Sequence, residues 1–226
     1  MQIELQHRPG NSAAKITLQP GESITTEGGA MIAMSNHLHI ETTTRQKGGS
    51  GGVLKALKRL VGGESFFLNH YTAPGAPGEL YLAATLPGDM MTYDLDGETL
   101  IVQATSYVAA GAGVEVDTGW QGFKSILSGE SLFWLNLKGR GPVVLSSFGA
   151  IYPVEVDGEY IVDTGHIVAF NETLNFTITK AGGSWLTAIL GGEGLVCKFQ
   201  GRGTVWCQSH NPSGFGHALG PLLKAR

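Results

Sequence analysis

The first candidate for chemistry in this sequence is a pair of histidines, His37 and His39. Successive side chains of a β-strand point to opposite faces, so residues two apart share one face. Two imidazoles on one face can bind a transition metal. Leu38 and Ile40 are apolar, however, so the same alternation also describes a strand with one buried face and one polar face.

The histidine pair matches the start of the H-x-H metal motif that cupins carry on a β-barrel, but the match ends there. Glu41 stands directly after Ile40, which is too close to serve as the cupin glutamate. The positions aligned with the two histidines elsewhere in the chain hold other residue types, namely Gly113 with Glu115 and Thr173 with Asn175. We therefore expect His37 and His39 to be exposed strand residues, and we keep a cupin-like small-ligand or metal-binding protein as an alternative.

Other signatures of catalysis do not appear in the sequence. The segment 129–132 lacks the final glycine of a G-x-S-x-G nucleophile elbow, and the glycine run 48–52 lacks the G-K-[ST] ending of a P-loop. Three glutamates in similar contexts, Glu64, Glu130 and Glu193, would bind a cation only if a threefold arrangement brought them together. We favour hydrogen bonds from nearby backbone to each of them. The sequence thus predicts no catalytic residues, no cofactor and no enzyme activity.

One predicted helix, residues 53–61, has a charged side. Lys55, Lys58 and Arg59 oppose an apolar stripe that includes Leu57 and Val61. A basic amphipathic helix can lie on an acidic membrane or an acidic partner. The stripe recurs twice later in the chain and the cations do not, so we expect the stripe to face the core. The three cations stay candidates for a contact with a membrane or a protein.

The elements that would position these residues occur three times. The segment 62–67 (GGESFF) returns as 128–133 (SGESLF) and as 191–196 (GGEGLV). Each copy follows an apolar stripe at i, i+3, i+4 spacing, which predicts a short helix. The repeats predict units at residues 1–88, 89–150 and 151–210, a flexible insertion near 45–52 and a C-terminal tail at 211–226.

Between the repeated segments the residues alternate between apolar and polar, as β-strands do. Three corresponding pairs are predicted to be buried, namely Leu38 with Ile40, Val114 with Val116, and Leu174 with Phe176. Hairpin turns are predicted at Asp96-Gly97, Asp157-Gly158, Gly139-Arg140-Gly141 and Gly201-Arg202-Gly203. Small β modules bury little surface alone, so we expect the units to pack against one another.

Composition narrows the classes of function. The 226 residues are 42% hydrophobic and 15% charged, which favours a folded core. The net charge of −4 argues against a nucleic-acid partner, because such partners require a positive field. Cys197 and Cys207 are too few for a disulfide scaffold, so we expect reduced, buried thiols. The N-terminal residues do not have the pattern of a signal peptide and no apolar run has the length of a membrane span, so we expect a cytoplasmic location.

The repeats, the segment 28–31 (GGAM) and the two Gly-Arg-Gly tripeptides resemble the bacterial branch of the altered-inheritance-of-mitochondria twenty-four family, over nearly the whole chain. The resemblance implies an all-β, TRAP-like fold, named after the tryptophan RNA-binding attenuator protein. It also implies three β-sandwich units around a pseudo-threefold axis, each with one short helix. Mitochondrial relatives are linked to inner-membrane organisation without established catalysis, so the resemblance implies no catalytic residues.

These observations together predict a non-enzymatic, cytoplasmic protein that acts as an assembly or interaction module. Edge strands of similar β modules have to be covered, and neighbouring copies of the chain can cover them, so we expect a homo-oligomer. The alternatives are the cupin-like protein and a membrane-surface protein that uses Lys55, Lys58 and Arg59.

Overall fold

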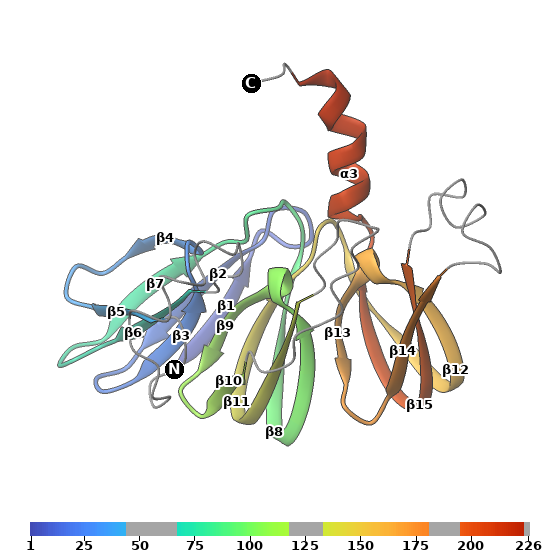
Figure 1. Ribbon diagram of the computed structural model, residues 1–226. Helices are drawn as coiled ribbons and strands as arrows, with labels where there is room; N and C mark the ends of the chain where they lie inside the picture. Colours follow the sequence, from blue (N-terminus) through green and yellow to red (C-terminus); the bar gives the residue numbers. More distant parts are fainter. Residues whose placement is uncertain (44–66, 118–132, 181–194, 224–226) are drawn as a thin grey trace.

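The computed structural model describes residues 1–43, 67–117, 133–180 and 195–223, and these residues form a mainly β structure (Figure 1). The strands of the N-terminal part are β1 (Gln2–Gln6), β2 (Ala13–Leu18), β3 (Ser23–Glu27), β4 (Met31–Met34), β5 (His39–Thr43), β6 (Leu68–Thr72) and β7 (Gly78–Leu82). The central strands are β8 (Met90–Gln103), β9 (Tyr107–Gly111), β10 (Val114–Asp117) and β11 (Trp134–Ser146). The C-terminal strands are β12 (Ile151–Asp163), β13 (Ile167–Asn171), β14 (Asn175–Lys180) and β15 (Leu195–Gln208).

The strands form two hydrogen-bonded sets with antiparallel pairing. The smaller set has the order β1-β2-β7-β4. The larger set has 11 strands in the order β12-β15-β13-β8-β11-β9-β3-β6-β5, with β10 paired to β11 and β14 paired to β15. The larger set thus runs without a break from the C-terminal strands, through the central ones, to the N-terminal ones. These findings confirm the prediction of an all-β fold in its coarse form.

Four long strands correct the predicted hairpin turns. Gly97 and Gly158 lie inside β8 and β12, and the two Gly-Arg-Gly tripeptides lie inside β11 and β15. At Gly97, Gly139, Gly158 and Gly201 the φ angles are 104, 116, 105 and 126°, which glycine adopts with little strain. The strand pairs therefore bend and continue through the glycines. Apolar alternation resumes on both sides of a bend as it does on both sides of a hairpin, so the pattern cannot separate the two.

Three of the four bent strands, β8, β11 and β15, meet different neighbours along their two halves, whereas β12 pairs with β15 throughout. The C-terminal half of β8 lies beside β13, with Ala169 opposite Val102 and Asn171 opposite Leu100. The C-terminal half of β11 lies beside β9. In the N-terminal part no single strand runs through the corresponding positions, because residues 19–22 separate β2 from β3 and residues 73–77 separate β6 from β7.

Three hydrophobic clusters form the core, and each takes residues from more than one part of the chain. The N-terminal cluster, built around Leu18 and Leu80, includes Val108 of β9. The central cluster includes Val168 of β13. The C-terminal cluster includes Trp134 of β11, whose ring meets Phe170 edge-on with centroids 5.3 Å apart. Neighbouring parts of the chain therefore complete one another's cores.

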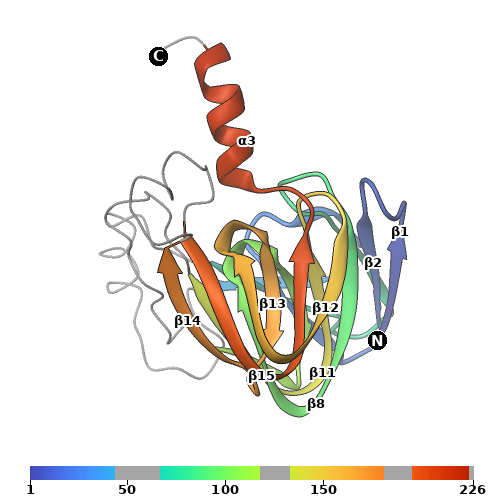
Figure 2. The same ribbon diagram turned by 90° about the vertical axis from the view of Figure 1, so that its right-hand side faces the viewer.

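The C-terminal tail forms a helix, α3 (Pro212–Leu219), that stands away from the sheets (Figures 1 and 2). The Asn211 side chain begins it by accepting hydrogen bonds from the backbone N–H groups of Ser213 and Gly214, at 2.8 and 3.2 Å. Among the residues described, none of the helices has the length and apolar character that spanning a membrane requires. The predicted helices before Glu64, Glu130 and Glu193, and the insertion near 45–52, lie outside the described residues.

Candidate functional site

The histidine pair lies on an exposed surface. His37 and His39 are both exposed, and Nε2 of His37 is 3.1 Å from the carbonyl oxygen of Pro77. The described residues hold no group of three or more His, Cys, Asp or Glu side chains that could bind a metal ion. Leu38 is buried as predicted, but Ile40 is 40% exposed, which corrects the prediction of a buried pair. Ile40 lies on β5, the last strand in the order of its sheet, so no further described strand covers it.

The other predicted residues divide into two groups. Lys55, Lys58 and Arg59, and the glutamates Glu64, Glu130 and Glu193, lie outside the residues that the structure describes. Cys197 and Cys207 are free and buried. Burial raises the pKa of the Cys197 thiol to about 12 and that of the Cys207 thiol to about 11. Because the thiolate is the nucleophile, these thiols are poorly suited to covalent chemistry.

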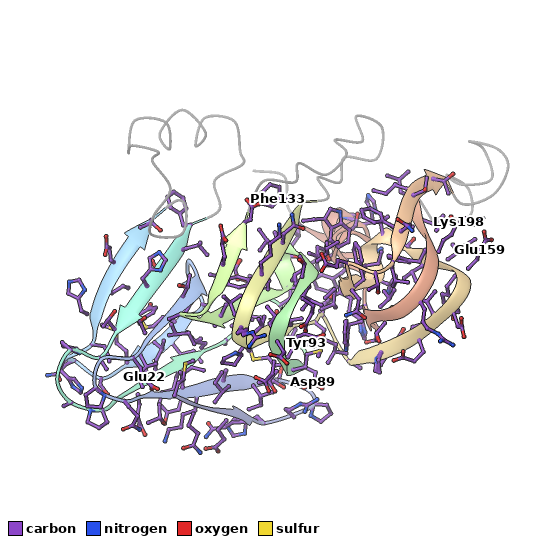
Figure 3. All side chains as sticks on the ribbon, turned by 90° about the horizontal axis from the view of Figure 1, so that it is seen from below. Glu22, Asp89, Tyr93, Phe133, Glu159 and Lys198 are labelled. Atoms are coloured by element: carbon purple, nitrogen blue, oxygen red, sulfur yellow. The ribbon has the colours of Figure 1, made fainter. Side chains whose placement is uncertain are left out.

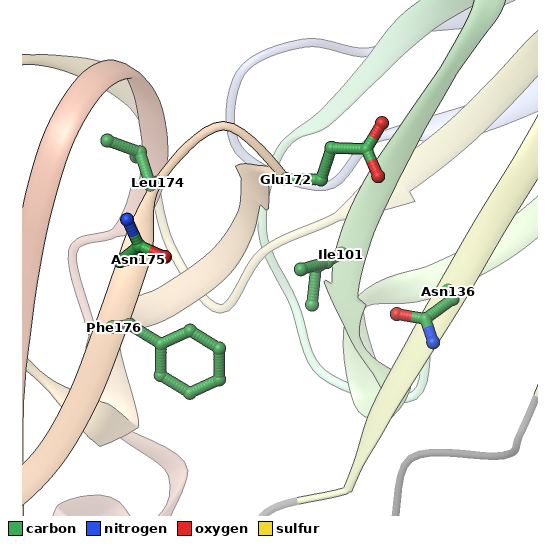
Figure 4. Close-up of a pocket in the computed structure, with 6 residues that line it drawn as sticks. All are labelled: Ile101, Asn136, Glu172, Leu174, Asn175 and Phe176. Atoms are coloured by element: carbon green, nitrogen blue, oxygen red, sulfur yellow. The ribbon is translucent and has the colours of Figure 1, made fainter.

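A pocket of about 280 Å³ opens where the central strands face the turn into β14 (Figure 4). Ile101 and Asn136 line one side, and Glu172, Leu174, Asn175 and Phe176 line the other. The Glu172 carboxylate accepts a hydrogen bond from the backbone N–H of Thr99 at 3.0 Å, so it links the two sides. Mixed polar and apolar walls of this kind suit a small ligand, although the volume is at the lower limit for such sites.

Two open strand edges, those of β4 and β12, lie where other parts of the chain have a further paired strand, while β1, β5, β10 and β14 also have one partner each among the described strands. In the described part of the chain β3 pairs with β6 on one side and β9 on the other, and β8 pairs with β11 and β13. We call the β9–β3 and β13–β8 pairings the closed junctions. By contrast, the strand pairing of β4 involves β7 alone and that of β12 involves β15 alone among the described strands. An edge of this kind presents backbone donors and acceptors to a further strand.

Near its C-terminal end β12 is exposed, whereas the corresponding residues of β3 and β8 are covered by a neighbouring strand. Tyr160 and Ile161, near the end of β12, are 47% and 59% exposed. At the same distance from the strand end, Leu100 of β8 and Ile24 of β3 are almost fully buried. Burying an apolar side chain of this size is worth roughly 1.5–3 kcal/mol. The uncovered end of β12 is therefore a costly surface for an isolated chain.

The open edge of β4 shows the same contrast. The pairing of β4 with β7 shifts register between Met31 and Ala33, which leaves Ile32 unpaired and 57% exposed. β9 and β13 carry the same irregularity, which leaves Val108 and Val168 without a pairing partner in their own ladders. Both valines are fully buried in the core of the preceding part of the chain. Ile32 has the same position in its strand without that cover.

Charged side chains are buried and hydrogen-bonded next to β8, and exposed to solvent near the open edge of β12. Asp89, the residue before β8, is buried and accepts hydrogen bonds from Arg8 at 2.8 and 2.9 Å and from Ser12 at 2.9 Å. The hydrogen bond from Arg8 holds the pKa of Asp89 below its usual range. At the outer end, Glu159 and Lys198 form an ion pair of 2.8 Å on the exposed surface, far from Asp89 (Figure 3).

Glu27 ends β3 at the β9–β3 closed junction. It is partly buried, and desolvation raises the pKa of its carboxyl to about 7. A carboxyl that titrates near neutrality can act as a proton donor or acceptor. The hydroxyl groups near it are used in hydrogen bonds to backbone: Thr26 donates to the carbonyl of Glu27 at 3.0 Å, and Tyr107 donates to the carbonyl of Thr25 at 2.9 Å. We interpret Glu27 as a structural group whose charge is disfavoured.

Sequence reasoning did not find the open edges. The available signal was the set of positions occupied by Ile32, Val108 and Val168, each the second residue of its strand. All three are apolar, so the sequence treats them alike, and only the strand order shows that Ile32 lacks a cover. The pocket was also missed, because its walls come from separate segments.

Comparisons with known proteins agree with the fold. The family model described as mitochondrial biogenesis AIM24 matches residues 3–210. An uncharacterised protein of Streptococcus pyogenes serotype M6 is 28% identical over 210 residues, which are 91% of this chain and 84% of that protein. A crystal structure of a Streptococcus pyogenes protein, solved by a structural genomics consortium, has a TM-score of 0.79 and 25% identity and covers 98% of this chain and 99% of that one.

Proposed function

The chain belongs to the AIM24 family, and we propose that it is a non-enzymatic assembly protein that acts through self-association in the cytoplasm. The observation that carries the proposal is the pair of open edges with exposed Ile32, Tyr160 and Ile161. Large apolar side chains on an unpaired strand edge mark either an interface or an aggregation hazard. A protein that keeps two such edges requires something to cover them.

The proposal includes three repeated TRAP-like β-sandwich units, at residues 1–88, 89–150 and 151–210. Two sets of pairings support it, because β11 pairs with β8, β9 and β10, while β15 pairs with β12, β13 and β14. In the N-terminal part β6 and β7 together pair with β2, β3, β4 and β5. Closure of the three units around a pseudo-threefold axis would need β4 to meet β12 of the same chain, whereas the two lie at opposite ends (Figure 1). Closure therefore stays a competing prediction, because self-association through these edges leaves both of them free for other copies.

Light scattering of the untagged protein tests the proposal. We expect the measured mass to be several times 23.8 kDa, which is the mass of one chain. The measurement is made together with identification of proteins that co-purify with the native protein. A mass of one chain at all concentrations, with no co-purifying protein, would contradict the proposed function.

A second candidate function is binding of a small ligand in the pocket beside Ile101 and Phe176. Native mass spectrometry of freshly purified protein would show a bound molecule as an added mass. Ile101→Trp would fill the pocket and remove that mass, while Ile40→Trp, on exposed β5, serves as the control. An unmodified mass in the wild-type protein would count against this function.

Two further alternatives stay predictions. Metal bound through His37 and His39 would appear in elemental analysis of the untagged protein and would be lost in His37→Ala. Membrane binding through Lys55, Lys58 and Arg59 would appear as salt-sensitive binding to anionic vesicles, lost when the three cations are replaced by glutamine.

A further inference from the structure

We propose that β4 of one copy of the chain pairs antiparallel with the C-terminal half of β12 of a second copy, with Ala33 opposite Val162. The inference rests on the proposed self-association and names its interface. Residues 159–163 of β12 form one half of this interface, and β4 forms the other. We call this contact the inter-chain junction.

The two closed junctions give the pattern for the inter-chain junction. In each, the strand after a three-residue connection pairs with the strand that precedes the corresponding connection in the part before it: β9 with β3, and β13 with β8. The connections are residues 28–30, 104–106 and 164–166, so β4, β9 and β13 start at the same distance from the strand before them. β4 is therefore the counterpart of β9 and β13, and β12 is the counterpart of β3 and β8.

The register of the inter-chain junction follows from the closed ones. The third residue of β9, Ala109, lies opposite Thr26, and the third residue of β13, Ala169, lies opposite Val102. Thr26 and Val102 are each the last residue but one of their strand, and so is Val162 of β12. Transfer of this pattern sets Ala33 opposite Val162 and Met34 opposite Ile161.

The apolar side chains at the two open edges correspond to those that are buried at the closed junctions. At the closed junctions Val108 enters the N-terminal core and Val168 enters the central core. Among the described residues the C-terminal core receives no such residue from a further part of the chain, because Val108 and Val168 belong to the other two cores and Ile32 is exposed. Ile32 of a second copy has the position and apolar character to enter beside Val162, which belongs to this core.

The reciprocal contact has a counterpart as well. Ile101 of β8 packs against the C-terminal core at the β13–β8 closed junction. Ile161 occupies the matching position on β12 and is exposed. At the inter-chain junction it would face the segment after β4, where Leu38 belongs to the N-terminal core. Both partners thus gain cover for an isoleucine that is more than half exposed.

The position of the two open edges determines the type of assembly. β4 and β12 lie at opposite ends of the molecule (Figure 1). The contact therefore joins two different surfaces, head to tail, and each added copy presents a new open edge. Such contacts produce a closed ring or an open filament.

Two single variants and their mixture test the inter-chain junction. Ile32→Glu places a charge on the β4 edge, and Ile161→Glu places one on the β12 edge, while Ile40→Glu makes the same exchange at an exposed strand residue outside the interface. Sedimentation velocity measures the mass of each variant, with circular dichroism as the control for folding. We expect Ile32→Glu and Ile161→Glu to have the mass of one chain and Ile40→Glu to assemble like the wild type.

The mixture separates a head-to-tail contact from a symmetric one. An Ile32→Glu chain keeps an intact β12 edge, and an Ile161→Glu chain keeps an intact β4 edge. An equimolar mixture should form a two-chain species and nothing larger. Assembly of the folded single variants at the wild-type mass, or a mixture that stays at one chain, would overturn the proposed junction and leave self-association standing. A wild-type protein that never exceeds one chain would overturn both.

Discussion

The C-terminal halves of β8 and β12 have the same local structure and different surroundings. Each pairs on one side with the long strand that ends its part of the chain, and each is followed by a single 3₁₀ turn. β8 is covered on the other side by β13, and its Leu100 is fully buried, whereas Tyr160 of β12 is 47% exposed. The comparison shows that burial here is decided by the neighbouring strand and not by the strand's own residues. Matched substitutions in the two regions test this difference.

The largest difference is expected between Val168→Asp and Ile32→Asp. Val168 is fully buried at a closed junction, so a carboxylate there loses its hydration without a partner, which costs several kcal/mol and should unfold the protein. Ile32 is exposed at the corresponding position, and Ile32→Asp should change the free energy of unfolding by less than about 0.5 kcal/mol in the unassembled chain. Urea unfolding at low protein concentration compares them. Equal losses in the two variants would refute the distinction between closed and open edges.

A smaller difference is expected between Asp89→Asn and Asp157→Asn. A hydrogen bond to a buried charged group contributes about 1.5–3 kcal/mol to stability. Asp89→Asn removes the charge that faces Arg8, so the free energy of unfolding should fall by roughly that amount. Asp157 pairs with Arg202 at 2.9 Å on the exposed surface of β12, and such pairs contribute about 0–1 kcal/mol. Thermal unfolding at pH 7 measures both.

The pH dependence identifies the role of the Asp89 charge. Its pKa is lowered in the folded state from the ordinary 3.8, so its contribution is present above about pH 4 and is lost as the pH falls through the folded-state pKa. Asp89→Asn should therefore flatten the acid side of the stability curve. An unchanged acid side in this variant would show that another group controls acid unfolding.

The charge of Glu27 should affect stability in the opposite direction to that of Asp89, and Glu27→Gln tests this. Burial raises the pKa of Glu27 from 4.5 to about 7, so the ionised form is disfavoured in the folded state, and stability falls as the pH rises from about 4.5 to about 7. Glutamine removes that charge, so we expect a Tm a few degrees higher at pH 8, roughly 2–5 °C, and no gain at pH 4. Glu159→Gln, at the open end, should give no gain at pH 8, because Lys198 lowers the pKa of Glu159. A gain that is the same at both pH values would contradict the burial explanation.

The smallest effect on stability is expected from a thiol probe. Ile161→Cys places a thiol on the open edge, where it should react quickly with an alkylating reagent at low protein concentration. Cys197 and Cys207 should react slowly in the same protein, because both are buried and have raised pKa values. Mass spectrometry of labelled peptides measures the rates. Rapid labelling of Cys197 in the folded protein would show that the C-terminal core opens readily.

The sequence allowed the β class, the family and the burial of Leu38 to be predicted, because alternation and repeated glycines are local signals. It did not allow the course of the chain at Gly97 and Gly158 to be predicted, since a bend in a long strand and a hairpin turn use the same residues. The prediction that Ile40 is buried was wrong for a different reason. Apolar and polar residues do alternate around it, but β5 is the last strand of its sheet among the described residues, so no further strand covers Ile40. The open edges depend on strand order, which no local pattern contains.

Hydrogen exchange at two protein concentrations distinguishes the closed junctions from the inter-chain junction. The backbone amides of β13 at residues 169–171 and of β8 at 100–102 should be protected at both concentrations, because the closed junction lies within one chain. The amides of residues 32–34 and 159–162 that point away from β7 and β15 should exchange quickly in the dilute protein and slowly in the concentrated, assembled protein. Rapid exchange of these outward-pointing amides in an assembled protein would contradict the claim that β4 and β12 join neighbouring copies.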